Sequence, residues 1–473
     1  MKRFTVLLLF LGGIFSALWA EVRLPAIFSD NMVLQQRTRV NLWGKASPGK
    51  RVHVLPSWRR TPLVTEADAE GRWRLQVPTP KACRNQQIRI WEKDTLYINN
   101  VLIGEVWLCS GQSNMEFPVC KHPDVYWQTG MENAEEELRD ADYPELRLFR
   151  MEPQLSETEE LDDCKGRWVS CKPSELYDFS AIAFVFGRRL HTALRLPVGI
   201  IQCTWGGTHA ESWTKMSVMQ HDSLYAPVLA KFKEYHQAHK HPAVCWNGMV
   251  APILGFTLKG NIWYQAESNW PRAEAYEQVF TNLINSWRKE WKQPDMPFYF
   301  MQVAPHVDLP PLLREAQLNV WQSGLKNLGM ATVPDAGDSL DIHPRNKRIA
   351  GERLALWALA KQYDHPVAYC GPLFHKLKVQ GSKLILTFKY AKQGLMTPND
   401  APVEGFVVAG SDGRFYPAKA VIRGSRVEVS SPQVSHPVAV RYGWGRFFRA
   451  NLYNKEGLPA FPFRSDQWKL SHN

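Results

Sequence analysis

Strand-like and helix-like segments alternate between residues 101 and 362, and this alternation constrains the fold more than any other feature of the sequence. Buried strands that alternate with helices usually form a parallel sheet, and the helices cover both of its faces. The expected strands are 105–109, 198–204, 260–264, 298–303 and 330–333, and the expected helices are 180–193, 223–239 and 276–291. The sequence therefore predicts an α/β domain built on a parallel sheet.

Short alternating apolar segments lie on both sides of this region, separated by Gly, Pro and charged turns. Such segments are typical of small β-sandwiches, and after Asp364 they include 383–388, 405–409 and 427–429. We expect four parts: a signal peptide at 1–20, an N-terminal β-sandwich at 21–100, a central α/β domain at 101–365 and a C-terminal β domain at 366–473.

The first twenty residues have the composition of a signal peptide. Lys2 and Arg3 precede the apolar run 4–10, and small residues end at Ala20. No later stretch approaches about 20 uninterrupted apolar residues, which is the length that spans a membrane. We therefore expect an exported protein, periplasmic or secreted, without a membrane span.

The charge pattern argues against a nucleic-acid partner. The chain has a net charge of +11, but its basic residues are scattered and form no nucleic-acid-binding motif. A positive chain of this kind attracts anionic sugars or surfaces weakly.

Cysteine and histidine spacing gives little sign of a metal site. The eight cysteines form no CxxC pattern, and Cys164 with Cys171 is the best candidate disulfide pair in an exported chain. His236, His239 and His241 have metal-like spacing, but no carboxylate follows Glu234 nearby, so we expect no metal and no cofactor.

Four polar clusters lie at the end of an expected strand or at the start of its helix. They are Gly-Gln-Ser-Asn at 111–114, Trp-Gly-Gly-Thr at 205–208, Gln-Ala-Glu-Ser-Asn at 265–269 and Asp-Ile-His-Pro at 341–344. The carboxyl ends of parallel strands share one edge of a sheet, where α/β proteins bind ligands. We therefore expect the four clusters to meet.

Each cluster also has an ordinary structural explanation. Ser113 could simply form a turn, and His343 could cap a helix whose first turn contains Pro344. Together, however, the clusters offer a nucleophile, a base, a main-chain N–H in the glycine turn at 206–207 and an amide at Gln265 for an oxyanion. Their joint presence favours a serine-dependent acyl-transfer site.

The chain resembles the SGNH-type esterases, and within them the sialate O-acetylesterase group. The resemblance covers nearly the whole mature chain and rests on several long motifs in one order. The motifs are LPAIFSDNMVLQQ, GQSNME, WGGT, NGMVAPI, IWYQAESN, REAQ, DIHP and NLYNKEGLPAFPFRSD. The family's fold is a flavodoxin-like, three-layer sandwich around a parallel sheet.

The resemblance implies that Ser113 is the nucleophile and His343 the base, and that the oxyanion donors are Ser113 N–H, Gly206 N–H and the Gln265 amide. Further candidate site residues are Gly207, Asn247, Glu267, Asn269 and Asp338. The chain departs from the family where Ala266 replaces a usual Gly and His209 a common Pro.

The implied activity is removal of O-acetyl groups from sialic acids through an acetyl-enzyme, so the expected partner is an O-acetylated carbohydrate. Two alternatives stay open at this point. One is an acetylesterase for xylan or xyloglucan, because the same site would serve any exposed O-acetyl sugar. The other is a carbohydrate-binding protein on an inactive esterase scaffold. The sequence says nothing about the oligomeric state.

The carboxylate that orients His343 has two candidates. Many SGNH esterases place an acid three residues before the His, but Leu340 occupies that position here. Asp341 is two residues upstream and Asp338 five. We favour Asp341, which suits either contact with the imidazole or an Asx-turn to the backbone N–H of His343. Asp338 comes next, and a Ser-His dyad without a carboxylate is the third possibility.

Overall fold

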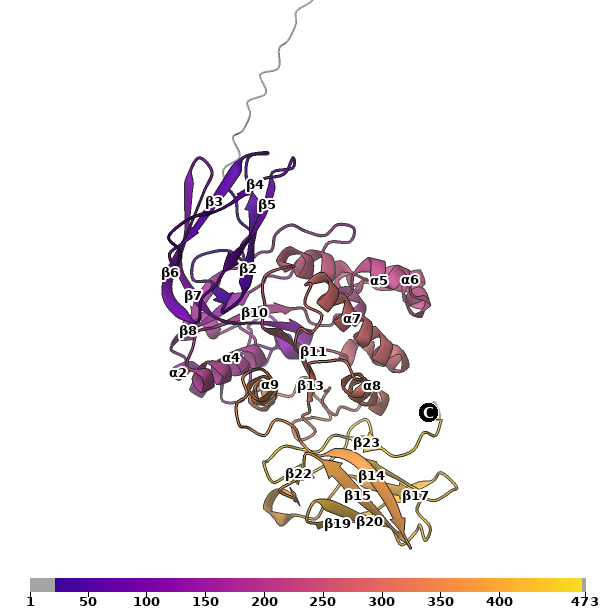
Figure 1. Cartoon of the computed structure of the whole chain (residues 1–473). Helices are drawn as coiled ribbons and strands as arrows, with labels where there is room; N and C mark the ends of the chain where they lie inside the picture. The colour runs from indigo at the N-terminus through magenta and orange to yellow at the C-terminus, as the bar shows by residue number, and fades with distance from the viewer. Residues whose placement is uncertain (1–21, 470–473) are drawn as a thin grey trace, which may run out of the picture.

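The computed structural model describes residues 22–469, so the predicted signal peptide at 1–20 lies outside the described residues. Within the described range, a central α/β unit carries β-sheet units on two sides (Figure 1). This arrangement confirms the predicted α/β class, with a central, mostly parallel sheet and additional β domains.

The N-terminal unit consists of two groups of strands, which are antiparallel except that β1 pairs in parallel with β7. Its strands are β1 (Val33–Gln35), β2 (Arg39–Lys45), β3 (Arg51–Pro56), β4 (Leu63–Glu66), β5 (Arg72–Pro78), β6 (Cys83–Trp91) and β7 (Thr95–Gly111). β2 pairs with β5, whereas β3 pairs with β4 and β6, and β6 pairs with β7. Buried and more exposed residues alternate along β2 and β3, so one face of each strand enters the core.

β7 joins the N-terminal unit to the central sheet as one unbroken strand. Its first part pairs with β6, and the part from Glu105 to Gly111 lies between two parallel neighbours, β10 (Val198–Thr204) and β11 (Gly260–Tyr264). The predicted boundary at residue 100 therefore falls inside a strand. The first part of β7 is partly exposed and the second part is fully buried. Because the pattern of polar and apolar residues changes in the middle of the strand, the sequence suggests two separate strands.

The central sheet brings three strand ends together. Its other strands are β8 (Tyr143–Arg150), β9 (Trp168–Cys171), β12 (Phe298–Met301) and β13 (Leu328–Ala331). The order is β13-β12-β11-β7-β10-β8-β9, and only β9 runs antiparallel to its neighbour. β10 and β11 flank β7 on opposite sides, which makes its carboxyl end a switch point where α/β proteins bind ligands.

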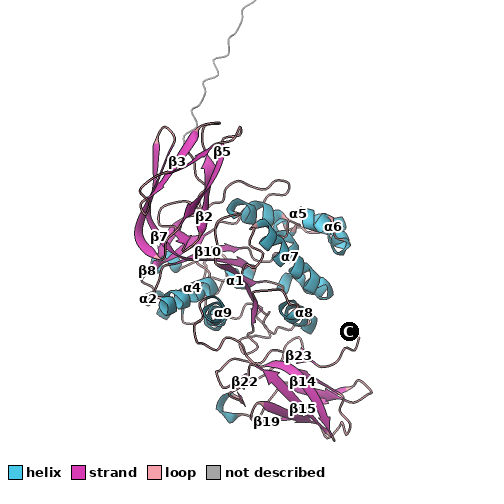
Figure 2. Cartoon of the chain, viewed as in Figure 1, coloured by secondary structure: helices cyan, strands magenta, loops and turns pink. Residues whose placement is uncertain are grey.

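The long helices cover both faces of this sheet. α4 (Ala181–Leu194) packs with α9 (Lys347–Gln362), and α7 (Tyr276–Glu290) packs with α8 (Pro311–Gln322) on the other side (Figure 2). The shorter helices are α1 (Ser113–Glu116), α2 (Ala134–Arg139), α3 (Pro173–Leu176), α5 (Met216–Gln220) and α6 (Ala226–Lys231).

The predicted helix at 223–239 is wrong. Only α6 is α-helical there, and 3₁₀ turns occupy 223–225, 232–234 and 238–240. After Tyr235 the segment has no large apolar side chain before Pro242, so it lacks the apolar stripe that would hold a helix on the core.

The C-terminal unit has its own apolar core, to which Leu384, Val408 and Val427 contribute. Its strands are β14 (Leu373–Gln380), β15 (Lys383–Lys389), β16 (Leu395–Met396), β17 (Phe406–Ala409), β18 (Phe415–Pro417), β19 (Lys419–Arg423), β20 (Arg426–Ser430), β21 (Ala439–Tyr442), β22 (Tyr453–Asn454) and β23 (Phe463–Arg464). Two four-stranded sheets, β14-β15-β20-β19 and β18-β17-β21-β23, enclose this core.

The cysteines form no disulfide in this structure, since all eight are free thiols. In the expected pair, Cys164 precedes β9 and Cys171 is the last residue of β9, and an extended strand adds about 3.3 Å per residue. Between residues 22 and 469, no helix is long and apolar enough to cross a membrane.

Candidate active site

Ser113 follows the carboxyl end of β7 as the first residue of α1. The turn depends on Gly111, which has a φ of +138°. A Cβ atom at that position would lie 2.1 Å from the carbonyl oxygen of Tyr264, so only glycine fits. The hydroxyl of Ser113 is thereby placed at the switch point of the sheet.

His343 reaches Ser113 from the loop before α9. Its Nε2 atom lies 2.8 Å from Ser113 Oγ, and Trp127 stacks on the ring with centroids 4.8 Å apart. Burial lowers the pKa of His343 to about 3, and the charges of Lys347 and His306 act in the same direction. The imidazole is therefore neutral at neutral pH and able to accept the hydroxyl proton.

The predicted helix start at His343 is wrong. α9 begins at Lys347, and Asn346 is its N-cap, with Oδ1 accepting the N–H of Ile349 at 3.4 Å. Asn is a favoured N-cap residue, and the sequence prediction overlooked it by placing Pro344 in the first turn. His343 is consequently a loop residue whose orientation depends on its side-chain contacts.

Asp341 is the carboxylate nearer to the imidazole. Its Oδ1 accepts the backbone N–H of His343 at 2.8 Å and lies 3.6 Å from Nδ1. Oδ1 of Asp338 instead accepts the backbone N–H groups of Leu340 and Asp341, at 2.7 and 3.2 Å. Asp341 therefore contacts both the backbone and the ring of His343, whereas Asp338 contacts only the backbone of the loop that carries Asp341.

Gly206 lies beside the nucleophile, since a Cβ atom there would be 3.4 Å from Ser113 Cβ. Its N–H is not free, because it donates to Oε2 of Glu116. Burial raises the pKa of Glu116 to about 7, although the Gly206 hydrogen bond and the charge of Arg150 oppose the shift. A carboxyl group thus occupies one of the predicted oxyanion donors. Gly207 follows with a φ of +72° and completes the turn.

Gln265 differs from the prediction. Its Nε2 donates to the carbonyl oxygen of Thr208 at 3.2 Å and to Oδ1 of Asn269 at 2.7 Å, and its Oε1 accepts the Tyr276 hydroxyl at 2.9 Å. No amide hydrogen remains for an oxyanion. The motif showed that a Gln amide lies at the strand end. It did not show that this amide would donate to Asn269, four residues later. Ala266 has a φ of +151°, in the region that favours the usual glycine.

A buried polar network ties the nucleophile turn to the histidine loop. Asn114 Nδ2 donates to Oε1 of Glu267 at 2.6 Å and to the carbonyl oxygen of Ile342 at 3.1 Å. Lys347 Nζ donates to Asn114 Oδ1 at 2.5 Å. Burial raises the pKa of Glu267 and lowers that of Lys347 to about 7. Glu267 therefore contacts the nucleophile turn through Asn114, next to Ser113.

Asn269 and Asn247 were predicted as additional site residues, but both contact the surrounding scaffold. Asn269 Nδ2 donates to Oε2 of Glu211 at 2.8 Å, and its Oδ1 accepts the N–H of Ala210. Asn247 Nδ2 donates to the carbonyl oxygen of Ser156 at 3.1 Å. Asn269 supports the loop after β10, whereas Asn247 fixes the segment before β9.

Three residues at the site were missed. Glu116 lies three positions after Ser113, a spacing that puts both on one face of a helical turn. Lys347 is the first residue of α9, whereas His343 lies in the loop before it, so helical spacing gave no signal for Lys347. Trp127 gave none, because its contact with the imidazole joins segments far apart in the sequence.

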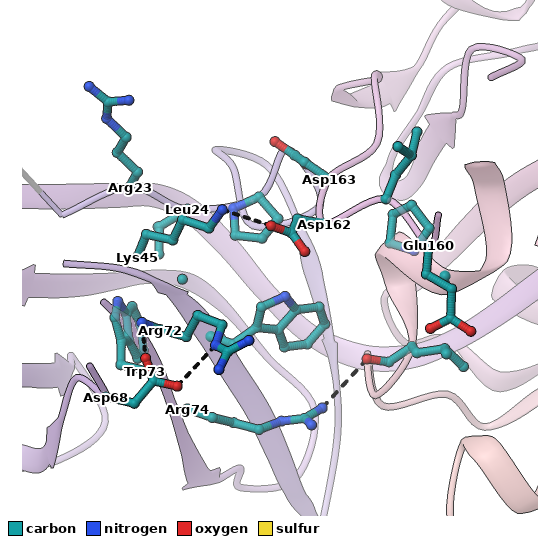
Figure 3. A pocket seen from close by; sticks show the side chains of 17 residues that line it. Arg23, Leu24, Lys45, Asp68, Arg72, Trp73, Arg74, Glu160, Asp162 and Asp163 are labelled. Carbon is teal, nitrogen blue, oxygen red and sulfur yellow. Dashed lines mark hydrogen bonds and ion pairs between the residues drawn. The ribbon is translucent and has the colours of Figure 1, made fainter. Parts of the chain in front are cut away.

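A cavity of about 610 Å³ lies between the N-terminal unit and the loops 160–163 and 251–254. Lys45 pairs with Asp162 across it, and Arg72 pairs with Asp68 on one wall (Figure 3). None of the candidate site residues lines this cavity. Within residues 22–469, no group of three or more His, Cys, Asp or Glu side chains is arranged to hold a metal ion.

A serine hydroxyl bonded to a neutral imidazole at the carboxyl edge of a parallel sheet is an arrangement used for ester hydrolysis. The fold and the site place the protein in the class of carboxylic ester hydrolases. The chain belongs to the family of carbohydrate esterases described as sialic acid-specific acetylesterases, whose model matches residues 103–360. This match confirms the resemblance carried by the motifs.

Known relatives match nearly the whole length of the chain. Sialate O-acetylesterase from Homo sapiens is 29% identical over 94% of both chains, and its counterpart from Mus musculus is 27% identical over 97% of both. The crystal structure of a carbohydrate acetylesterase from Xanthomonas citri aligns with a TM-score of 0.85 and 32% identity, over 94% of this chain and all of that one.

Proposed function

We propose that the protein is a serine esterase that removes O-acetyl groups from sialic acids through an acetyl-enzyme. The 2.8 Å contact between His343 Nε2 and Ser113 Oγ is the observation that carries the proposal. The substrate class comes from the names of the human and mouse relatives. A chain with a net charge of +11 also suits a sugar that bears a carboxylate.

In the first half of the reaction, Ser113 Oγ attacks the carbonyl carbon of the acetyl group while His343 Nε2 takes the hydroxyl proton. The negative charge moves to the former carbonyl oxygen. That intermediate collapses, the bond to the sugar oxygen breaks, and the imidazolium returns the proton to the departing sugar hydroxyl. Water then repeats the sequence on the acetyl-Ser113 ester and releases acetate.

The oxyanion in this mechanism is held by the main-chain N–H groups of Ser113 and Gly206. Because Glu116 accepts the Gly206 N–H in the free protein, the acetyl oxygen has to replace the Glu116 oxygen when substrate binds. A protonated Glu116 leaves more easily than a carboxylate and does not repel the developing charge. The neutral form of Glu116 is therefore the active one.

Asp341 completes the proposed triad. Its carboxylate stabilises the positive charge that forms on His343 after proton transfer, and its hydrogen bond to the backbone N–H of His343 fixes the loop. Asn114, Glu267 and Lys347 keep the two loops at the distance that the proton transfer needs.

We also propose that the central domain has the SGNH-type three-layer sandwich. The strands β7, β10, β11, β12 and β13 stand in the flavodoxin-like order 2-1-3-4-5, counted as they occur in the chain, with β8 and β9 added beside β10. The proposed domains are 21–100, 101–365 and 366–473, with β7 passing through the first boundary.

Export is a further proposal, and it rests on the signal peptide composition of residues 1–20. The mature protein is then periplasmic or secreted. N-terminal sequencing of protein from the extracytoplasmic fraction tests it: a start near Glu21 supports export, and an intact Met1 contradicts it.

The activity is tested by measuring acetate release from O-acetylated N-acetylneuraminic acid and from acetylated xylan, side by side. A higher kcat/KM on the sialic acid supports the proposal. A higher kcat/KM on xylan favours an acetylesterase for plant polysaccharides instead. If acetate is released from neither substrate and p-nitrophenyl acetate is not hydrolysed, the result favours the inactive carbohydrate-binding protein.

A further inference from the structure

Lys240 lies beside the turn that contains Gly206 and Gly207. A Cβ atom on Gly207 would lie 3.8 Å from Lys240 Cε and 3.4 Å from His239 Nε2. Gly206 in turn lies against Ser113, and consecutive Cα atoms are only ~3.8 Å apart. The side chains of the 3₁₀ turn Ala238–Lys240 therefore form one wall of the site next to Ser113, although the turn follows Ser113 by more than 120 positions in the sequence.

The ammonium group of Lys240 has no carboxylate partner among residues 22–469, although the side chain is partly buried. The nearby acids are engaged elsewhere. Glu211 pairs with Arg272 at 2.9 Å, and Glu116 accepts the Gly206 N–H. A cation without a carboxylate partner is available to pair with an anionic ligand.

His239 supplies a neutral polar group on the same wall. Its ring stacks on Trp205, with centroids 5.4 Å apart and planes 20° from parallel. Burial lowers the pKa of His239, and the charge of Lys240 acts in the same direction, so the ring stays uncharged at neutral pH. Trp205, His239 and Lys240 thus combine an aromatic face, a hydrogen-bonding nitrogen and a cation, which suits a carboxylated sugar.

We propose that Lys240, with His239 beside it, binds the carboxylate of the sialic acid while Ser113 attacks its O-acetyl group. This inference rests on the proposed function, because it concerns the same site. Lys240 contributes to the choice of substrate and takes no part in proton transfer. It therefore affects KM for the charged sugar, whereas kcat and the hydrolysis of uncharged esters do not depend on it.

The test uses N-acetylneuraminic acid and its methyl ester as competitive inhibitors of p-nitrophenyl acetate hydrolysis. The two sugars differ in the carboxylate charge. In the wild type, the acid should bind about tenfold more tightly than the ester, the size expected for one partly exposed charge pair. Lys240→Gln should remove this difference and leave p-nitrophenyl acetate hydrolysis unchanged. Lys233→Gln, an exposed lysine of the same segment, is the matched control and should behave like the wild type.

Equal inhibition of the wild type and Lys240→Gln by the acid overturns the inference, and so does an absence of inhibition in the wild type. The proposed function is judged separately, by acetate release from O-acetylated sialic acid. Release with an unchanged KM in Lys240→Gln leaves the function standing and removes the carboxylate site. If Lys240→Gln loses inhibition but the wild type releases no acetate, the carboxylate site is supported and the proposed function is rejected.

Discussion

Replacing Asp341 by asparagine should lower kcat about a hundredfold while leaving the histidine loop in place. Asn keeps an oxygen that can accept the backbone N–H of His343, so the 2.8 Å hydrogen bond survives. What is lost is the negative charge 3.6 Å from His343 Nδ1. That charge matters only when the imidazole becomes positive in the transition state, so kcat is the parameter that should fall.

The expected magnitude follows from Coulomb's law. Two unit charges about 4 Å apart interact by about 1 kcal/mol in water and about 4 kcal/mol at an effective dielectric constant of ~20. The side chain of Asp341 is 44% exposed, so solvent screens the pair and the value lies between these limits. Each ~1.4 kcal/mol is a factor of ten in rate, which gives a loss of about a hundredfold.

Asp338→Asn is the matched control, because asparagine can still accept the N–H groups of Leu340 and Asp341. Its kcat should stay within about threefold of the wild type, since no ion pair with His343 is lost. The assay is the kcat for p-nitrophenyl acetate, with circular dichroism to verify folding. A larger loss in Asp338→Asn than in Asp341→Asn would identify Asp338, not Asp341, as the acid that serves His343, and near-normal rates in both favour a Ser-His dyad.

Three further variants test the surroundings of the site. Wild-type activity should fall as pH rises through about 7, because Glu116 then loses its proton. Glu116→Gln should abolish this fall, and pH-rate profiles measure it. Because the pKa of Glu116 is raised, its contribution to the free energy of unfolding is present below pH 4.5 and is lost as pH rises through about 7. At pH 8, denaturant unfolding should therefore show that Glu116→Gln is more stable than the wild type, by up to about 3 kcal/mol. Gly206→Ala should lower kcat at least about tenfold with little change in melting temperature, because the new Cβ would lie 2.9 Å from Glu116 Oε2 and 3.2 Å from Trp127. Lys347→Met should raise the pKa of His343 toward its ordinary value, and an unchanged acid limb of kcat/KM would contradict this.

The fold was predictable where burial alone determines the pattern. β11 occupies 260–264 and β10 occupies 198–204, both as predicted, because fully buried parallel strands appear as continuous apolar runs. The prediction failed at 223–239, where the apolar stripe is too short to hold a helix. It also missed the first part of β7, whose exposure pattern changes along one strand.

Site residues were predictable where the side chain lies in the loop that directly follows a parallel strand. Ser113 and His343 meet because parallel strands deliver their following loops to one edge of the sheet. The environment of each group was not predictable in this way. The Gln265 amide donates to Asn269, and the Gly206 N–H donates to Glu116. Both hydrogen bonds depend on which of several nearby polar groups pairs with a buried donor, and the sequence does not show this.

The rate of acetate release by Ser113→Ala tests directly whether Ser113 is the nucleophile. We expect a loss of about 10⁴-fold or more in a protein that keeps its melting temperature, because the variant lacks the only atom proposed to carry the acetyl group. Ser435→Ala, on the surface of the C-terminal unit, is prepared in parallel and should retain the wild-type rate. Turnover by Ser113→Ala within about tenfold of the wild type would contradict the account.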